Sequence, residues 1–142
     1  MLKKFIRQFT KDNIFDLHAI TELDGKLFIT SSTPPGLLKK GPKYAGFYVG
    51  EKLKKYFEPS FLLLDLIAKH TEHKIAVDEK TAWLFVCGRD ILASVSDVFP
   101  EKTPVIITTK QDDVLGYGVV NRKDKFKVRN VFDRGDFLRR ER

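Results

Sequence analysis

The second half of the chain is a series of short β-rich runs separated by turn residues, and this pattern limits the folds open to it. Five runs are predicted as strands: Lys74–Val77, Ala82–Cys87, Pro104–Lys110, Val114–Val120 and Phe126–Phe132. Gly88–Ala93 is expected to form one or two helical turns, and Gln111–Asp113 a tight turn. Gly116 and Gly118 inside a strand predict sharp coiling or close backbone approach. Closely spaced strands with one short helix are typical of a small barrel or pseudo-barrel.

The first half of the chain predicts two hairpins. The first is expected from Phe15–Ile20 and Leu27–Thr30, and the second from Tyr44–Val49 and Leu53–Phe57. Asp24-Gly25 is a strong turn signal for the first hairpin. The second is expected to turn at Gly50-Glu51.

A helix and a domain boundary follow. Ser60 is a suitable N-cap, and the apolar residues of Phe61–His70 recur at helical spacing. With 42% hydrophobic residues the chain can bury a core, which excludes disorder as its main state. We place the boundary near Thr71, which gives an α+β fold: an N-terminal α/β domain with an antiparallel sheet (residues 1–71) and a C-terminal pseudo-barrel (residues 72–142). Because each half is near the lower limit for independent stability, we expect the two to pack against each other.

Positive charge is concentrated in two parts of the chain, whose net charge is +7. Residues 39–55 hold six basic and one acidic side chain, and residues 121–142 hold nine and four, so each segment has a net charge of +5. A basic field of this kind attracts phosphate backbones. A solvated cationic surface that serves only solubility is the alternative.

The densest basic cluster supplies the candidate RNA-binding residues, which are Arg122, Lys123, Lys125, Lys127 and Arg129. In a strand that begins at Phe126, the side chains of Lys125, Lys127 and Arg129 share one face. Three like charges on one face repel one another and favour a polyanion. Four to five phosphate contacts give a log–log salt slope of about −3, at roughly −0.7 per contact to a single strand. Phe126 is interpreted as a core residue, with base stacking as the alternative.

A second group of lysines offers an extension of the RNA path or a separate partner surface. Lys39, Lys40 and Lys43 lie in a segment rich in proline and glycine, and Lys52 and Lys54 lie at the second hairpin. We expect Lys52 and Lys54 to share a strand face. Simple solvation explains this group equally well.

Residues suited to catalysis or metal binding are few. Cys87 is the single cysteine, so an internal disulfide and a cysteine-based zinc site are excluded, and we expect it to be a small buried hydrophobe. Of the histidines His18, His70 and His73, the last two are expected to face solvent at a helix end. We therefore expect no metal, no cofactor and no catalytic site. No apolar run approaches the ~20 residues of a membrane span, and no secretory signal follows the basic start, which favours an intracellular protein without membrane contact.

Several segments resemble a PUA domain, the RNA-binding module named after pseudouridine synthases and archaeosine transglycosylase. They are Trp83–Leu92 (interpreted as a strand, then a glycine entering a short helix), Leu115–Val120 and Arg134–Arg139. Over roughly residues 25–141 the chain is similar to the Nip-seven family of large-subunit ribosome-biogenesis proteins in its archaeal form. The hairpin Phe47–Phe57 and the helix segment Leu64–Ala68 extend that resemblance.

The resemblance implies an N-terminal α/β domain joined to a PUA pseudo-barrel, and RNA binding by basic PUA side chains, here Arg122, Lys123, Lys125 and Lys127. It implies a non-catalytic, monomeric factor for precursor ribosomal RNA that binds uridine- or AU-rich single strands. Ribosome-assembly proteins or exosome subunits are the implied protein partners, in the cytoplasm of an archaeon or the nucleolus of a eukaryote. Compared with that family, we expect this chain to lack part of the opening helical segment. The alternatives are an RNA-modification enzyme, or its substrate-delivery subunit, acting on transfer or ribosomal RNA, and a scaffold that binds only proteins.

Overall fold

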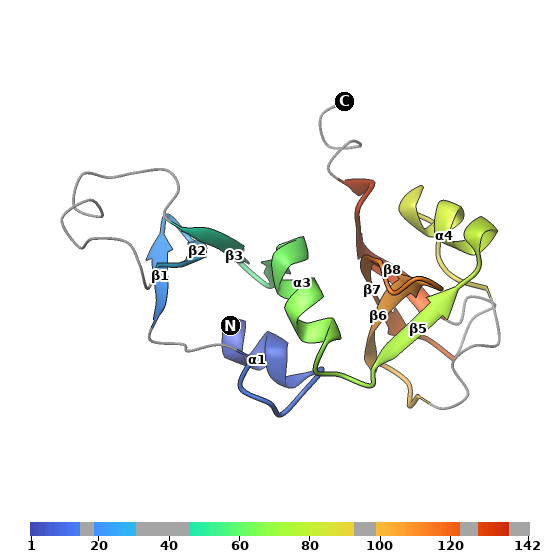
Figure 1. The fold of residues 1–142 in the computed structure, drawn as a ribbon, viewed down its shortest axis with the longest axis horizontal. Helices are drawn as coiled ribbons and strands as arrows, with labels where there is room; N and C mark the ends of the chain where they lie inside the picture. Colours follow the sequence, from blue (N-terminus) through green and yellow to red (C-terminus); the bar gives the residue numbers. More distant parts are fainter. Residues whose placement is uncertain (15–18, 31–45, 93–98, 123–127, 137–142) are drawn as a thin grey trace. The chain divides into compact units, whose positions relative to one another are not determined.

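The computed structural model describes residues 1–14, 19–30, 46–92, 99–122 and 128–136 (Figure 1). The chain divides into two compact units, Met1–His70 and Thr71–Arg142, and each contains a four-stranded sheet. The predicted α+β class is confirmed by these two sheets and their helices. The packing of the two domains against each other stays a prediction. Within the described ranges, no helix is long and apolar enough to cross a membrane.

The described residues of the N-terminal unit form an antiparallel sheet and two helices. The sheet has the order β1-β2-β3-β4, and its strands are β1 (Ile20–Leu23), β2 (Lys26–Ile29), β3 (Phe47–Lys52) and β4 (Phe57–Pro59). The helices are α1 (Leu2–Arg7) and α3 (Phe61–Ala68). The ring of Phe5 on α1 lies 5.4 Å from that of Phe57 on β4, between centroids. Phe28 and Val49 are buried in the sheet, and Leu63 and Leu64 in α3.

The first hairpin turns where predicted, and its first strand lies later in the chain than predicted. β1 pairs with β2 in antiparallel register, and Leu23 faces Lys26 across the turn Asp24-Gly25. β1 is Ile20–Leu23, which shares only Ile20 with the predicted strand Phe15–Ile20. Residues 15–18 lie outside the described part of the chain.

The second hairpin turns later than predicted. β3 continues through Gly50 and Glu51, and the chain turns between Leu53, whose N–H donates to the carbonyl of Tyr56 at 2.9 Å, and Tyr56 itself. A Cβ on Gly50 would lie 2.4 Å from the ring of Phe57. This glycine therefore serves close packing of β3 against β4, not the turn.

Helix α3 begins at the predicted cap. The Ser60 hydroxyl accepts a hydrogen bond from the Leu63 backbone N–H at 3.1 Å, which satisfies one of the free donors of the first turn. The helix ends at Ala68, two residues before the predicted His70.

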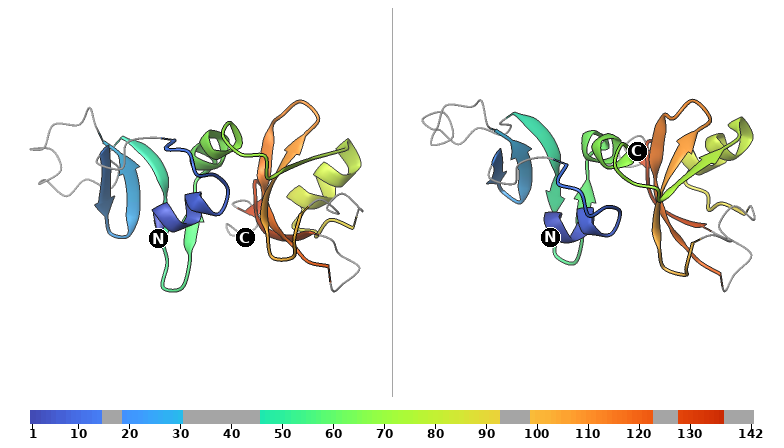
Figure 2. Two further views of the ribbon diagram at one scale, coloured as in Figure 1. Left: turned by 90° about the horizontal axis from the view of Figure 1, so that it is seen from below. Right: turned by 60° about the horizontal axis from the view of Figure 1, so that its bottom comes forward.

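Where it is described, the C-terminal unit is a mixed sheet with helix α4 against it. The sheet has the order β5-β6-β7-β8, and its strands are β5 (Lys74–Val77), β6 (Pro104–Thr109), β7 (Val114–Val120) and β8 (Val128–Asp133). β5 is parallel to β6, and the other pairs are antiparallel. Figure 2 shows α4 (Glu79–Val86) against one face of this sheet, where Phe85 joins a buried cluster with Val105 and Val128. The expected close approach at Gly116 is confirmed, since a Cβ there would lie 2.0 Å from the carbonyl oxygen of Phe132.

The predicted strand Ala82–Cys87 is wrong, because these residues belong to α4 and its C-cap. The Asp78 carboxylate accepts a hydrogen bond from the Thr81 backbone N–H at 2.7 Å and caps the helix. In a strand, Trp83 and Phe85 would share a face. In α4, Phe85 is 1% exposed and Trp83 is 67% exposed.

The segment after α4 also differs from the prediction. The expected helical turns at Gly88–Ala93 are absent from the described part, residues 88–92, and Ile91 instead forms an isolated antiparallel bridge with Val128. Cys87, expected to be buried, is exposed.

Candidate nucleic-acid interface

One end of the sheet β5–β8 carries exposed cations. β6 begins, β7 ends and β8 begins at this end, because β7 is antiparallel to both neighbours, and β5 begins there because it is parallel to β6. The exposed basic residues at these strand ends are Lys74, Lys102, Arg122 and Arg129, which we call the basic edge. In the described residues, Glu72, Asp90 and Glu101 are the acidic side chains near them, so the four cations outnumber the carboxylates by one.

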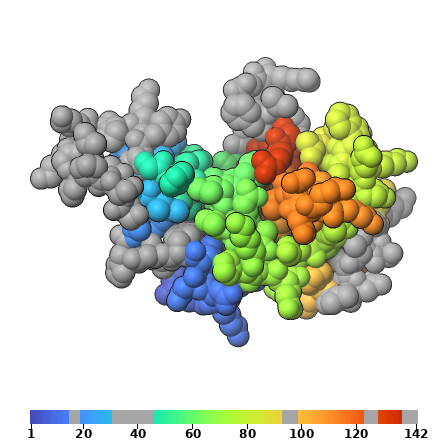
Figure 3. Space-filling view, viewed as in Figure 1, coloured from blue at the N-terminus to red at the C-terminus, as the bar shows by residue number. Residues whose placement is uncertain are grey.

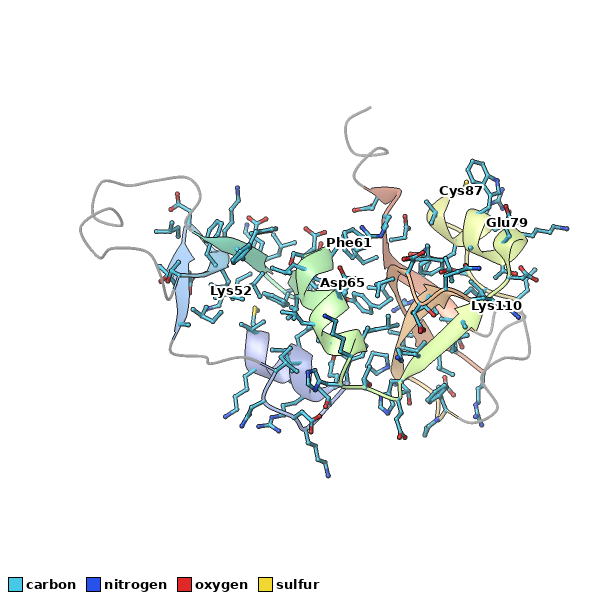
Figure 4. All side chains as sticks on the ribbon, in the orientation of Figure 1. Lys52, Phe61, Asp65, Glu79, Cys87 and Lys110 are labelled. Carbon is cyan, nitrogen blue, oxygen red and sulfur yellow. The ribbon has the colours of Figure 1, made fainter. Side chains whose placement is uncertain are left out.

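The opposite end of the same sheet is acidic. The carboxylates there are Asp78, Glu79, Asp112, Asp113, Asp133 and Asp136, against the cations Lys80, Lys110 and Arg134. Figure 4 shows Glu79 and Lys110 near the start of α4, at this acidic end. The unit is therefore polarised along its strands, and a polyanion is attracted to the basic edge and repelled from the other end.

The Asp78 carboxylate at the acidic end has a structural role as the N-cap of α4. Its hydrogen bonds from the backbone and side chain of Thr81 lower the pKa of Asp78 below its ordinary value, and the nearby Lys110 and Lys80 add to this effect. Asp78 and Glu79 line a cavity of about 510 Å³ together with Lys110 and Gln111 of the β6–β7 turn. The basic edge lies at the other end of the strands from this cavity.

Two of the five predicted RNA-binding residues lie in the described part, and the structure places both at the basic edge. The Arg122 guanidinium donates to the backbone carbonyl of Phe99, and its side chain is exposed. Arg129 is exposed on the sheet face opposite α4, because the preceding Val128 is buried in the cluster with Phe85. Lys123, Lys125 and Lys127 lie outside the described residues, as does Phe126.

Lys102 is a member of the basic edge that sequence reasoning missed. Its backbone N–H donates to the carbonyl of Val120 at 2.8 Å, and the Val120 N–H donates to the carbonyl of Thr103 at 2.9 Å. These bonds hold Lys102 beside Val120, the last residue of β7. Val120 precedes Arg122 by two residues. In the sequence Lys102 follows Glu101 in a locally neutral stretch, so charge counting gave no signal, and only the β6–β7 pairing brings it to this edge.

The second lysine group is partly described, and one expectation about it is wrong. Lys39, Lys40 and Lys43 lie outside the described residues. Lys52 is the last residue of β3 and Lys54 lies in the following turn, so the two do not share a strand face. The Lys52 ammonium lies 2.7 Å from a carboxylate oxygen of Glu22, and this ion pair reduces its attraction for a phosphate.

The histidines form no metal site within the described residues, where no group of three or more His, Cys, Asp or Glu side chains is placed to hold an ion. His70 Nδ1 lies 3.4 Å from an Asp12 carboxylate oxygen. His73 does not simply face solvent as expected: its Nδ1 is buried without a hydrogen-bond partner, and its ring lies edge-on to Phe99 at 5.7 Å. His18 lies outside the described residues.

Comparison with known proteins identifies the C-terminal unit. Residues 73–142, just under half of the chain, match the family described as the UPF0113 PUA domain. The chain is also 32% identical over 116 residues to a UPF0113 protein from Archaeoglobus fulgidus. That alignment covers 71% of this chain and 64% of the relative, so the chain spans less than two thirds of the length of the curated protein it matches.

A likeness to a solved structure is more distant. The crystal structure of a hypothetical protein from the hyperthermophilic archaeon Pyrococcus horikoshii OT3 is 14% identical and has a TM-score of 0.47, over 80% of this chain and 72% of that one. The family match confirms the PUA resemblance read from the sequence, and PUA domains are RNA-binding modules. The basic edge thus belongs to a PUA domain of the UPF0113 type, formed by residues 73–142.

Proposed function

We propose that this protein is a non-catalytic RNA-binding factor of the Nip-seven family that acts in assembly of the large ribosomal subunit. The observation that supports it is the convergence of Lys102, Arg122 and Arg129 at one end of a PUA domain whose other end is acidic. Cations arranged in this way contact successive phosphates and fix the position of a nucleic-acid backbone. They carry no direct sequence information.

The proposed ligand is a single-stranded uridine- or AU-rich segment of precursor ribosomal RNA. Ribosome-assembly proteins or exosome subunits are the proposed protein partners of a monomeric chain, in the cytoplasm of an archaeon or the nucleolus of a eukaryote. These assignments are supported by the sequence resemblance and by the archaeal source of the UPF0113 relative.

A salt-dependent titration tests the proposed site. We expect Arg122→Ala/Arg129→Ala to weaken binding of a uridine-rich RNA and to make the log–log salt slope less steep by about 1.4, at roughly 0.7 per lost phosphate contact. The control is Lys110→Ala, which removes a cation from the acidic end and should change the slope little. Wild-type affinity in the first variant, with the fold intact by circular dichroism, contradicts the proposed site.

Crosslinking in cells followed by RNA sequencing tests the proposed ligand. We expect precursor ribosomal RNA among the recovered sequences. Recovery of transfer RNA in its place would favour the alternative, in which the PUA domain delivers substrate to an RNA-modification enzyme.

A further inference from the structure

The outer side of α4 carries two exposed apolar side chains, although the inner side of the helix packs on the sheet. Ala82, Phe85 and Val86 pack in the buried cluster. On the other side of the helix Trp83 is 67% exposed and Leu84 is 40% exposed. The first three residues of α4, Glu79–Thr81, are polar, so the exposed apolar surface lies in the second half of the helix and is suited to a small apolar contact. Figure 3 shows α4 as a yellow-green ridge on the surface of the C-terminal unit.

Cations lie on both sides of Trp83 along this ridge. Lys80 precedes it by three residues, which places the two side chains on one side of the helix, and Lys80 is exposed. Arg89 is exposed just beyond the helix end. Glu79, four residues before Trp83, is the carboxylate of α4 on this side of the helix. An exposed aromatic ring between cations is the combination that single-stranded nucleic-acid sites use.

The C-terminal end of α4 lies close to the start of β8, which carries Arg129 of the basic edge. The Asn130 side-chain amide donates to the carbonyl of Phe85 at 2.8 Å, and the Asn130 backbone N–H donates to the carboxylate of Asp90 at 2.8 Å. The N–H of Ile91 donates to the carbonyl of Val128 at 2.9 Å, beside Arg129. These hydrogen bonds hold the C-terminal end of α4 against the start of β8, at the end of the sheet that carries the basic edge. Because the Arg129 side chain lies on the sheet face opposite α4, an RNA strand that contacts both Arg129 and the outer side of α4 has to pass around this end of the sheet.

The size of the ridge favours a base over a protein. A stable protein interface buries roughly 800 Å² on each partner, and an eight-residue helix is only about 12 Å long. One exposed indole, in contrast, is enough to stack one base, and loss of such a stack weakens binding about 5- to 150-fold.

We propose that Trp83 is a stacking platform for an unpaired base of the RNA that the basic edge holds by its phosphates. This inference rests on the proposed RNA-binding function and adds to it a contact that does not depend on phosphate charge. Arg89, beyond the C-terminal end of α4, holds the backbone beside the stacked base, and Glu79 at the acidic end opposes binding.

Trp83 is the only tryptophan of the chain, so its intrinsic fluorescence reports directly on the proposed stack. We expect a uridine- or adenosine-rich oligonucleotide to quench the emission over the same concentrations at which the anisotropy of a labelled copy rises. Trp83→Leu should weaken binding at least about 5-fold with an unchanged salt slope, because no phosphate contact is lost. Trp83→Phe should restore most of the affinity, and Glu79→Gln should increase it.

Leu84→Ala is the matched control, since it truncates the neighbouring exposed apolar side chain and should bind RNA as the wild type does. Three results would overturn the inference. The first is binding by anisotropy with no quenching and with wild-type affinity in Trp83→Leu. The second is an emission blue-shift on raising the concentration of the protein alone, which would show a second copy covering α4. The third is no RNA binding by the wild type, which would end the proposed function as well. The first result, found together with dependence of binding on Arg122 and Arg129, would end the stacking inference alone.

Discussion

Lys102 combines an exposed cation with a backbone conformation that glycine adopts more readily. Its φ is 67°, in the left-handed region, and the hydrogen bond from its N–H to the carbonyl of Val120 holds it there. This conformation costs a residue with a Cβ roughly 1–2 kcal/mol. The proposed phosphate binding at the basic edge gives a reason for a lysine at this position.

Replacement of Lys102 by glycine separates these two roles. We expect Lys102→Gly to leave the free energy of unfolding within about 1 kcal/mol of wild type, because relief of the backbone offsets the greater entropy of the unfolded chain. The RNA salt slope should become less steep by about 0.7. Urea unfolding and salt-dependent titration measure the two effects.

Two other positions provide controls for this variant. Asp112, with a φ of 66° at the acidic end, allows the same backbone change in Asp112→Gly without loss of a cation. Lys110→Ala removes a lysine at the opposite end of β6. If Lys110→Ala lowers the salt slope as much as Lys102→Gly does, then overall charge and not the basic edge governs binding.

Among the elements, α4 shows most clearly what local sequence could not reveal. The run Trp83–Cys87 is rich in aromatic and apolar residues and matches a buried strand as well as a helix segment of the same length. The Asp78 cap and the packing of Phe85 in one cluster with Val128 stabilise the helix and not a strand. By contrast, β5, β7 and the α3 cap at Ser60 were predictable, because their signals lie within a few residues.

The cap of α4 predicts a pH dependence. Because its hydrogen bonds with Thr81 lower the pKa of Asp78 in the folded state, this carboxylate stabilises the protein above its ordinary pKa of 3.8, and the contribution is lost as the pH falls below that value. Asn caps helices about as well as Asp and does not titrate. We expect the Tm of wild type relative to Asp78→Asn to be constant from about pH 5 to 8 and to fall from about pH 5 to 3. Parallel Tm curves over the whole range would contradict this role.

At the scale of the molecule, the charge count located only part of the candidate site. Counting in segments indicated residues 121–142, and the structure places Arg122 and Arg129 of that segment at the basic edge. Lys102 and Lys74 come from a part of the chain with a net negative charge, residues 56–120, and reach the same edge only through strand pairing. Trp83 was assigned to a strand, so its exposure could not be foreseen.

The two proposed contacts should separate in the kinetics of binding, because they act over different distances. Charges at the basic edge attract RNA across a Debye length of about 10 Å at 0.1 M salt, whereas Trp83 acts only after contact. We expect Arg122→Ala/Arg129→Ala to lower the association rate constant several-fold at about 0.05 M salt and much less at about 0.5 M. Trp83→Leu should leave that rate constant unchanged at both and raise the dissociation rate constant at least about 5-fold. Stopped-flow anisotropy of labelled RNA measures both constants. The contrary result is an association rate constant that is lower in Trp83→Leu than in the wild type at low salt but equal to it at high salt. Trp83 would then contribute to the electrostatic attraction of RNA and would not act as a stacking platform.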